Sequence, residues 1–112
     1  MTLKEIIAKL DLKVLTTSEA MDTATPQGGY ASDLLSCVVA GAQPGNLWIT
    51  LQAHMNVVAV AALREVSAVI ITENAQPDAD VIEKADQQGV ILLSTKEPSY
   101  QVVGKLWELG IR

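Results

Sequence analysis

The chain has 112 residues, of which 49% are hydrophobic, and it carries a formal net charge of −5. This length suits one domain, which we take to span residues 1–112. A negative charge repels phosphate backbones and anionic lipids, so we expect neither nucleic acid nor membrane as a partner, and the eight basic residues are scattered along the sequence.

Segments that would mark export or membrane insertion are not predicted. No apolar run reaches ~18 residues, and the N-terminal segment has a charged, helical pattern in place of the apolar stretch of a signal peptide. The single cysteine, Cys37, excludes an internal disulfide and lies in an apolar segment. We therefore expect a cytoplasmic protein whose cysteine is buried and unreactive.

The N-terminal third is expected to hold one helix and short extended segments. Thr2 and Glu5 have capping-box spacing and precede apolar residues at helical spacing, which predicts a helix up to residue 10. Residues 12–17 form a strand candidate. Residues 17–30 are polar and contain Gly28 and Gly29, which predicts a second short strand or an ordered loop.

The rest of the chain alternates helices and strands. Ser32 and Asp33 are good N-cap residues for a helix over 34–42. Three units of strand and helix follow, at 46–52 and 54–66, 68–73 and 78–89, and 90–95 and 98–110. Their strands are continuous apolar runs, which are typical of parallel strands buried on both faces. The sequence therefore predicts a three-layer αβα fold with a mostly parallel sheet of about four to five strands.

The helix over 54–66 has almost no polar face. A helix that is apolar all round is buried all round, and the sheet covers only one side of it. We therefore expect a homodimer in which a second copy of the chain covers the other side. The candidate interface residues are Met55, Val58 and Ala62.

Ligands of open parallel sheets bind beyond the carboxyl ends of the strands. Polar residues follow all three predicted strands there, and the glycine-rich turn and the start of the next helix are expected to close over the same edge. The candidate ligand-binding residues are Gly28, Gly29, Ser32, Asp33, Thr50, Gln52, His54 and Asn56. A lone histidine without a cysteine cluster is a poor metal site, so we predict no metal and no cofactor.

His54, the only histidine, has two interpretations. In a small enzyme it would act as acid or base with Asp33 or Glu73 as its partner. In a structural role it would cap a helix or bridge two loops. No Ser or Cys stands in a recognisable nucleophile context, which favours a chain without catalytic activity.

The stretch "GGYASDLLSCVVAGAQPGNLWITLQAHMNVVAVAALREVSAVIIT" resembles the DRTGG domain, and the similarity extends over nearly the whole chain. The segment "MDTATPQGGY" holds the place of the motif that names the family, with Asp22 and Gly28–Gly29 as its ends and without the arginine. The resemblance implies a fold similar to the N-terminal domain of the HPr kinase/phosphorylase. The phosphate loop of that kinase is absent from this sequence.

DRTGG domains stand beside CBS domains in regulated inorganic pyrophosphatases, where they take part in dimer contacts, and they also occur within phosphate acetyltransferases. The apolar helix over 54–66, the acidic composition and the absence of a catalytic constellation favour a non-catalytic regulatory or interaction domain that works as a homodimer. We expect it to bind a small polar or nucleotide-like ligand at the carboxyl ends of the strands, or a partner protein through the apolar helix. An accessory role for hydrogenase or signalling partners is the alternative that family gene context implies.

Overall fold

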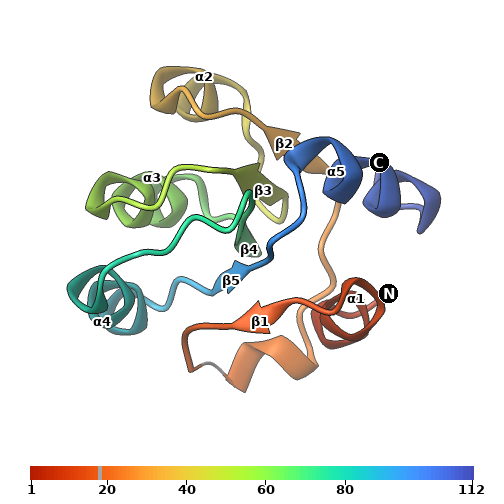
Figure 1. Cartoon of the computed structure of the whole chain (residues 1–112), viewed down its shortest axis with the longest axis horizontal. Coiled ribbons are helices and arrows are strands. Elements are labelled where there is room, and N and C mark those ends of the chain that lie inside the picture. The colour runs from red at the N-terminus through yellow and green to blue at the C-terminus, as the bar shows by residue number, and fades with distance from the viewer. Residues whose placement is uncertain (18) are drawn as a thin grey trace.

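One mixed sheet of five strands forms the centre of the computed structural model, which describes residues 1–17 and 19–112 (Figure 1). The elements in chain order are α1 (Leu3–Leu10), β1 (Lys13–Val14), the 3-10 helix η1 (Glu19–Asp22), β2 (Gly29–Ala31), α2 (Leu35–Gly41), β3 (Leu47–Thr50), α3 (Met55–Arg64), β4 (Ala68–Ile71), α4 (Ala79–Gln88), β5 (Leu92–Ser94) and α5 (Ser99–Glu108).

The strand order is β1-β5-β4-β3-β2. Strands β2 to β5 are parallel, and β1 pairs antiparallel with β5, with Lys13 opposite Ser94. The predicted mostly parallel sheet of about four to five strands is confirmed. The strand candidate at 12–17 is a two-residue antiparallel strand at the edge of the sheet.

The helices cover both faces of the sheet. In Figure 1, α2, α3 and α4 lie on one side, and α1 and α5 lie on the other. Neighbouring strand residues point to opposite faces, so that Leu47 and Ile49 pack with α1 and α5, while Trp48 packs with α2 and α3. This arrangement confirms the three-layer αβα fold.

The N-terminal helix begins with the predicted capping box. The Thr2 hydroxyl accepts a hydrogen bond from the Glu5 backbone N–H, and the Glu5 carboxylate accepts one from the Thr2 backbone N–H. The hydrogen bond from the Thr2 backbone, with a smaller contribution from its hydroxyl, lowers the pKa of the Glu5 carboxyl. This local pairing satisfies two backbone N–H groups at the start of α1.

The start of α2 differs from the prediction. Its N-cap is Leu34 and it has no side-chain capping bond. The Ser32 hydroxyl instead accepts a hydrogen bond from the Leu34 N–H, and Asp33 points to the neighbouring strand β3. Cys37 is exposed on this helix, so its predicted burial is wrong. The cause is that α2 lies at the end of its layer and buries only Val38.

Helix α3 lies in the middle of its layer, between α2 and α4. These neighbours and the sheet bury Val57, Val58 and Ala61. Val58 is only 1% exposed, so it belongs to the core and is unavailable as the interface residue that the sequence suggested. The apolar side chains that α3 leaves exposed are at Met55, Ala59 and Leu63, spaced four residues apart on one stripe of the helix.

Candidate functional site

The carboxyl end of β3 is held by a carboxylate from the loop after β2. Asp33 Oδ1 accepts hydrogen bonds from the Thr50 hydroxyl and from the Leu51 backbone N–H, both at 2.8 Å. The Gln52 N–H in turn donates to the Thr50 hydroxyl at 3.1 Å. Thr50 is fully buried. Asp33 and Thr50 therefore organise this loop and leave little capacity for contact with a ligand.

His54 stands at the N-cap position of α3, with an exposed side chain that forms no capping hydrogen bond. It borders an open groove of ≈ 360 Å³, together with Gln76 from the loop after β4 and Asp78 and Asp80 from the start of α4. Asn56 follows on the exposed surface of the first turn of α3. His54, Gln52 and Asn56 are thus brought together on one segment, at the edge where the sequence placed them.

The two carboxylates named as partners of His54 bind other groups. Asp33 bonds Thr50 and Leu51, as described above. Glu73 Oε2 accepts a hydrogen bond from the Ser99 backbone N–H at 2.9 Å. In the described part of the chain, no hydrogen bond or ion pair joins the His54 ring to a carboxylate. The geometry therefore contains no orienting partner for an acid or base at this position.

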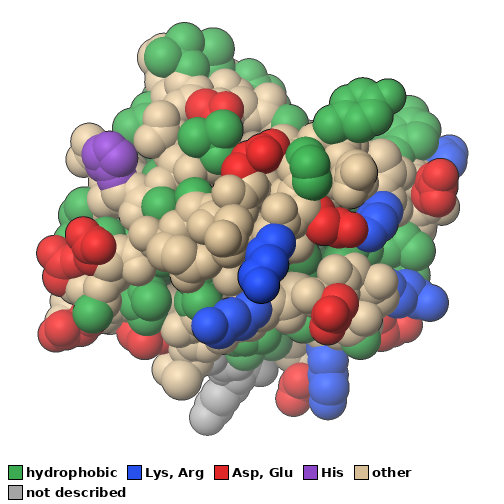
Figure 2. All heavy atoms as spheres, in the orientation of Figure 1, with side chains coloured by type: hydrophobic (Ala, Val, Ile, Leu, Met, Phe, Trp, Pro, Cys, Tyr) green, Lys and Arg blue, Asp and Glu red, His purple; other side chains and the backbone are tan. Residues whose placement is uncertain are grey.

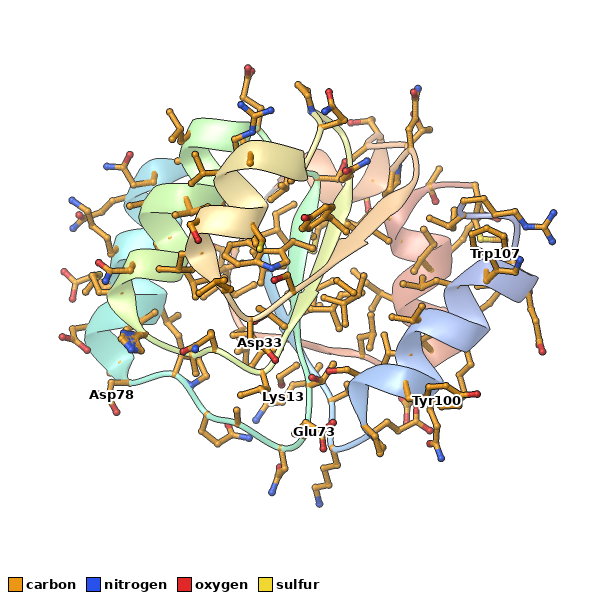
Figure 3. All side chains as sticks on the ribbon, turned by 90° about the horizontal axis from the view of Figure 1, so that it is seen from above. Lys13, Asp33, Glu73, Asp78, Tyr100 and Trp107 are labelled. Carbon is orange, nitrogen blue, oxygen red and sulfur yellow. The ribbon has the colours of Figure 1, made fainter. Side chains whose placement is uncertain are left out.

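The loops after β4 and β5 are joined by hydrogen bonds of their own. The Glu73 N–H donates to the Glu97 carbonyl and the Asn74 N–H to the Thr95 carbonyl. The Thr72 and Ser99 hydroxyls lie 2.6 Å apart, and both Glu73 and Asn74 have left-handed backbone angles. Consecutive non-glycine residues with positive φ are uncommon and strained, which is a feature of functional loops. Figure 3 shows Asp33, Glu73 and Asp78 in the same half of the molecule, with Asp33 nearer to its middle.

Sequence reasoning missed Ser99. The Pro98–Ser99 pair predicts only the start of a helix, and nothing in the sequence indicates that this helix begins beside Thr72. The contact depends on the pairing of β4 with β5, which places the ends of both strands together.

Gly28 and Gly29 lie at the opposite edge of the sheet. Gly29 is the first residue of β2 and pairs with Leu47, the first residue of β3, whereas Ala31 pairs with Ile49, which directly precedes the Thr50 end. A side chain at Gly28 would start 3.2 Å from the Asn46 amide nitrogen and 3.3 Å from the Arg112 carbonyl. Its φ of +68° also favours glycine. This pair serves a close approach of the backbone, and the prediction that it closes over the carboxyl edge is wrong.

Among the side chains of residues 1–17 and 21–112, no group of three or more His, Cys, Asp or Glu residues is arranged to hold a metal ion. None of the helices in the same ranges is long and apolar enough to cross a membrane.

Comparisons with known proteins identify the family. A search of curated proteins finds no match. Among solved structures, the chain is similar to the crystal structure of the CBS and DRTGG domains of the regulatory region of Clostridium perfringens pyrophosphatase, complexed with the activator diadenosine tetraphosphate. The TM-score is 0.76 at 18% identity, over 92% of this chain and 44% of that chain. The present chain therefore spans less than half of that neighbour, and the likeness shows the fold. The sequence also matches the DRTGG domain over residues 5–109, and the chain therefore belongs to the DRTGG domain family.

Proposed function

We propose that this chain is a non-catalytic regulatory domain that forms a homodimer through α3 and binds a small polar ligand at the carboxyl edge of its sheet. The fold neighbour is part of a regulatory region whose structure holds a nucleotide activator. The His54 ring has no carboxylate partner in the described chain, which supports a binding role over acid–base chemistry. The chain has a single cysteine and therefore no internal disulfide, which favours a location in the reducing cytoplasm.

The observation that carries this proposal is the position of residues 51–55. This short segment connects the carboxyl end of β3 to α3, and it supplies both Gln52 and His54 of the edge and Met55 of the exposed stripe. A ligand that orders the segment would also act on the first turn of α3. Ligand binding and dimer formation therefore share one structural element, as the coupling of two sites requires.

An exposed apolar surface supports the homodimer. Leu34 and Val39 of the α2 region and Met55 and Leu63 of α3 are large hydrophobic residues that remain exposed, and Leu63 is 65% exposed. The two helices are neighbours in one layer, and Figure 2 shows hydrophobic side chains over α2 at the top of the molecule. A two-fold symmetric dimer would place this surface against its own copy and remove it from water.

Leu63→Asp is expected to dissociate the dimer. An unpaired carboxylate buried at an apolar interface costs at least ~3 kcal/mol, which is about a hundredfold in the dissociation constant. Sedimentation velocity at micromolar concentration should give a dimer for the wild type and a monomer for the variant. Because Leu63 is mostly exposed within one chain, the far-ultraviolet circular dichroism of the variant should match that of the wild type.

Tyr100→Asp is the matched control, because Tyr100 is 89% exposed on α5, in the layer on the other face of the sheet. It should remain a dimer. A wild type that sediments as a monomer would contradict the homodimer. A dimer that is lost in Tyr100→Asp and kept in Leu63→Asp would move the interface to α5.

Ligand binding at the carboxyl edge should appear as a rise in melting temperature. A ligand that binds only the folded state adds ~2.7 kcal/mol of stability at a hundred times its dissociation constant. We expect ATP or diadenosine tetraphosphate to raise the melting temperature of the wild type, and His54→Ala to reduce the rise without lowering the melting temperature of the free protein. No rise with either compound would contradict a nucleotide-like ligand at this edge.

A further inference from the structure

Four of the six lysines gather around one hollow, although they are scattered along the sequence. This hollow, here called the lysine basin, has a volume of ≈ 570 Å³ and is lined by Lys9 and Lys13 from the N-terminal segment and by Lys96 and Lys105 from the region after β5, together with polar residues that include Asn74 and Ser94. The volume lies in the range of roughly 300–1,000 Å³ that is typical of small-molecule sites.

The charge of the lysine basin is opposite to that of the rest of the chain. Its lining contains four lysines and two carboxylates, Asp11 and Glu97, so the basin has a net charge of +2. Because the whole chain has a net charge of −5, the residues outside the basin have a net charge of −7. In Figure 2 the visible Lys and Arg side chains lie in the lower and right parts of the face, whereas the histidine lies at its left edge. A positive hollow on a negative protein concentrates small anions locally.

One of these lysines forms an ion pair, and the other three have no ionic partner among the side chains that the structure describes. Lys105 forms an ion pair with Glu97, with Nζ 2.6 Å from one carboxylate oxygen. Among the side chains of residues 1–17 and 21–112, no carboxylate lies within ion-pair distance of Lys9, Lys13 or Lys96, and these three lysines are exposed. Three ammonium groups around one hollow repel one another, and an anion between them would relieve that repulsion.

The topology also selects this place. The chain leaves β4 for α4 on one face of the sheet and leaves β5 for α5 on the opposite face. Adjacent parallel strands whose connections run to opposite faces open a crevice at their carboxyl ends, which is the usual ligand position in such sheets. The connections after β2, β3 and β4 all run to the same face, so no equivalent crevice opens beside Thr50.

We propose that the lysine basin binds the phosphate groups of a small phosphorylated ligand. This inference rests on the proposed ligand-binding function and names its chemical class and position. Lys9, Lys13 and Lys96 supply the positive charge, and the side chains of Asn74 and Thr95 supply neutral donors. The adjoining groove beside His54 shares Gln76 with the basin, so one ligand can extend from the phosphate position toward the imidazole.

A nucleic acid is a poor occupant of the same basin. The basin has a net charge of +2, and the −7 on the rest of the chain lies within reach of a long polyanion. Screening at physiological ionic strength acts over about 8 Å, so a ligand confined to the hollow avoids most of that repulsion. The charge distribution therefore favours a compact phosphorylated molecule.

Isothermal titration calorimetry with inorganic tripolyphosphate and with ATP tests this proposal. Both should bind the wild-type chain, more weakly at higher salt. Lys13→Ala and Lys96→Ala should each weaken binding about tenfold or more, since each removes a charged hydrogen bond. Lys84→Ala, on α4 and outside the basin, is the matched control and should bind like the wild type. Lys96→Gln removes the charge and keeps most of the side-chain length, so it should weaken binding as Lys96→Ala does. A circular dichroism melt of each variant shows whether the variant is still folded.

The outcomes separate this inference from the proposed function. No binding of either compound at millimolar concentration would overturn the basin, as would equal weakening by Lys84→Ala and Lys96→Ala. ATP binding that is lost in His54→Ala but kept in Lys96→Ala would also overturn it, although ligand binding at the carboxyl edge would then stand. A dimer that dissociates in Leu63→Asp while tripolyphosphate still binds would leave the basin supported.

Discussion

Trp48→Ala is expected to lower the free energy of unfolding by about 3–5 kcal/mol. The Trp48 ring is fully buried on β3, and its Nε1–H donates a hydrogen bond to the Ser32 carbonyl at 2.9 Å. The substitution leaves a large cavity between the sheet and the layer of α2 and α3, and it leaves that carbonyl without its partner. Urea unfolding followed by circular dichroism measures the change.

Trp107→Ala is the matched control for this substitution, because Trp107 is 57% exposed on α5 and stacks with the Arg112 guanidinium at 5.2 Å. Its loss should stay below ~1 kcal/mol. Trp48→Phe should fall between the two alanine variants, since it keeps most of the buried ring and loses the hydrogen bond. Equal losses from both alanine variants would contradict the assignment of Trp48 as the centre of the core.

Asp33→Ala is expected to lower the free energy of unfolding by about 2 kcal/mol. Hydrogen bonds to a charged acceptor each contribute roughly 1.5–3 kcal/mol, and exposure of the Asp33 side chain to water reduces their sum. The substitution leaves the buried Thr50 hydroxyl without its acceptor and frees the Leu51 N–H. Chemical unfolding measures the stability. Ligand binding near His54 should weaken as well, because Asp33 holds the segment that leads to α3.

Asp33→Asn separates a positioning role from a role of the negative charge. The amide keeps an oxygen at the same place, so most of the stability and ligand binding should return. Asp78→Ala is the second control, because Asp78 occupies the N-cap of α4 without a side-chain capping bond and its loss should stay within ~0.5 kcal/mol. If Asp33→Ala were as stable as Asp78→Ala, Asp33 would not organise the edge.

The carboxyl edge on which the proposals rest has two parts. The part beside β3 is closed by its own hydrogen bonds, and its free polar groups are Gln52, His54 and Asn56. The part beside β4 and β5 contains the lysine basin and a strained turn at Glu73 and Asn74. A ligand that spans both would contact the first turn of α3 with one end and the basin with the other.

The sequence by itself determined the layers and the parallel strands. Continuous apolar runs such as Leu47–Thr50 and Ala68–Ile71 are buried on both faces, which is typical of parallel strands covered by helices on both sides. The capping box of α1 and the left-handed Gly89 at the end of α4 also follow from local chemistry. The position of His54, Gln52 and Asn56 at the carboxyl edge was predictable because every βα connection begins there.

Only the tertiary structure decided how the strands are ordered and which residues meet at their ends. The antiparallel β1 brings Lys9 and Lys13 beside Ser94 and Lys96, which lie about 80 positions later in the sequence. No local sequence pattern indicates that β1 pairs with β5. The pairing of β2 with β3 places Gly28 and Gly29 at the amino end of the parallel strands. It also places Asp33 where its carboxylate accepts a hydrogen bond from the Thr50 hydroxyl. Local patterns report which face of an element is apolar, whereas strand order depends on long-range packing of every element together. The edge was therefore visible in the sequence, and the lysine basin was not.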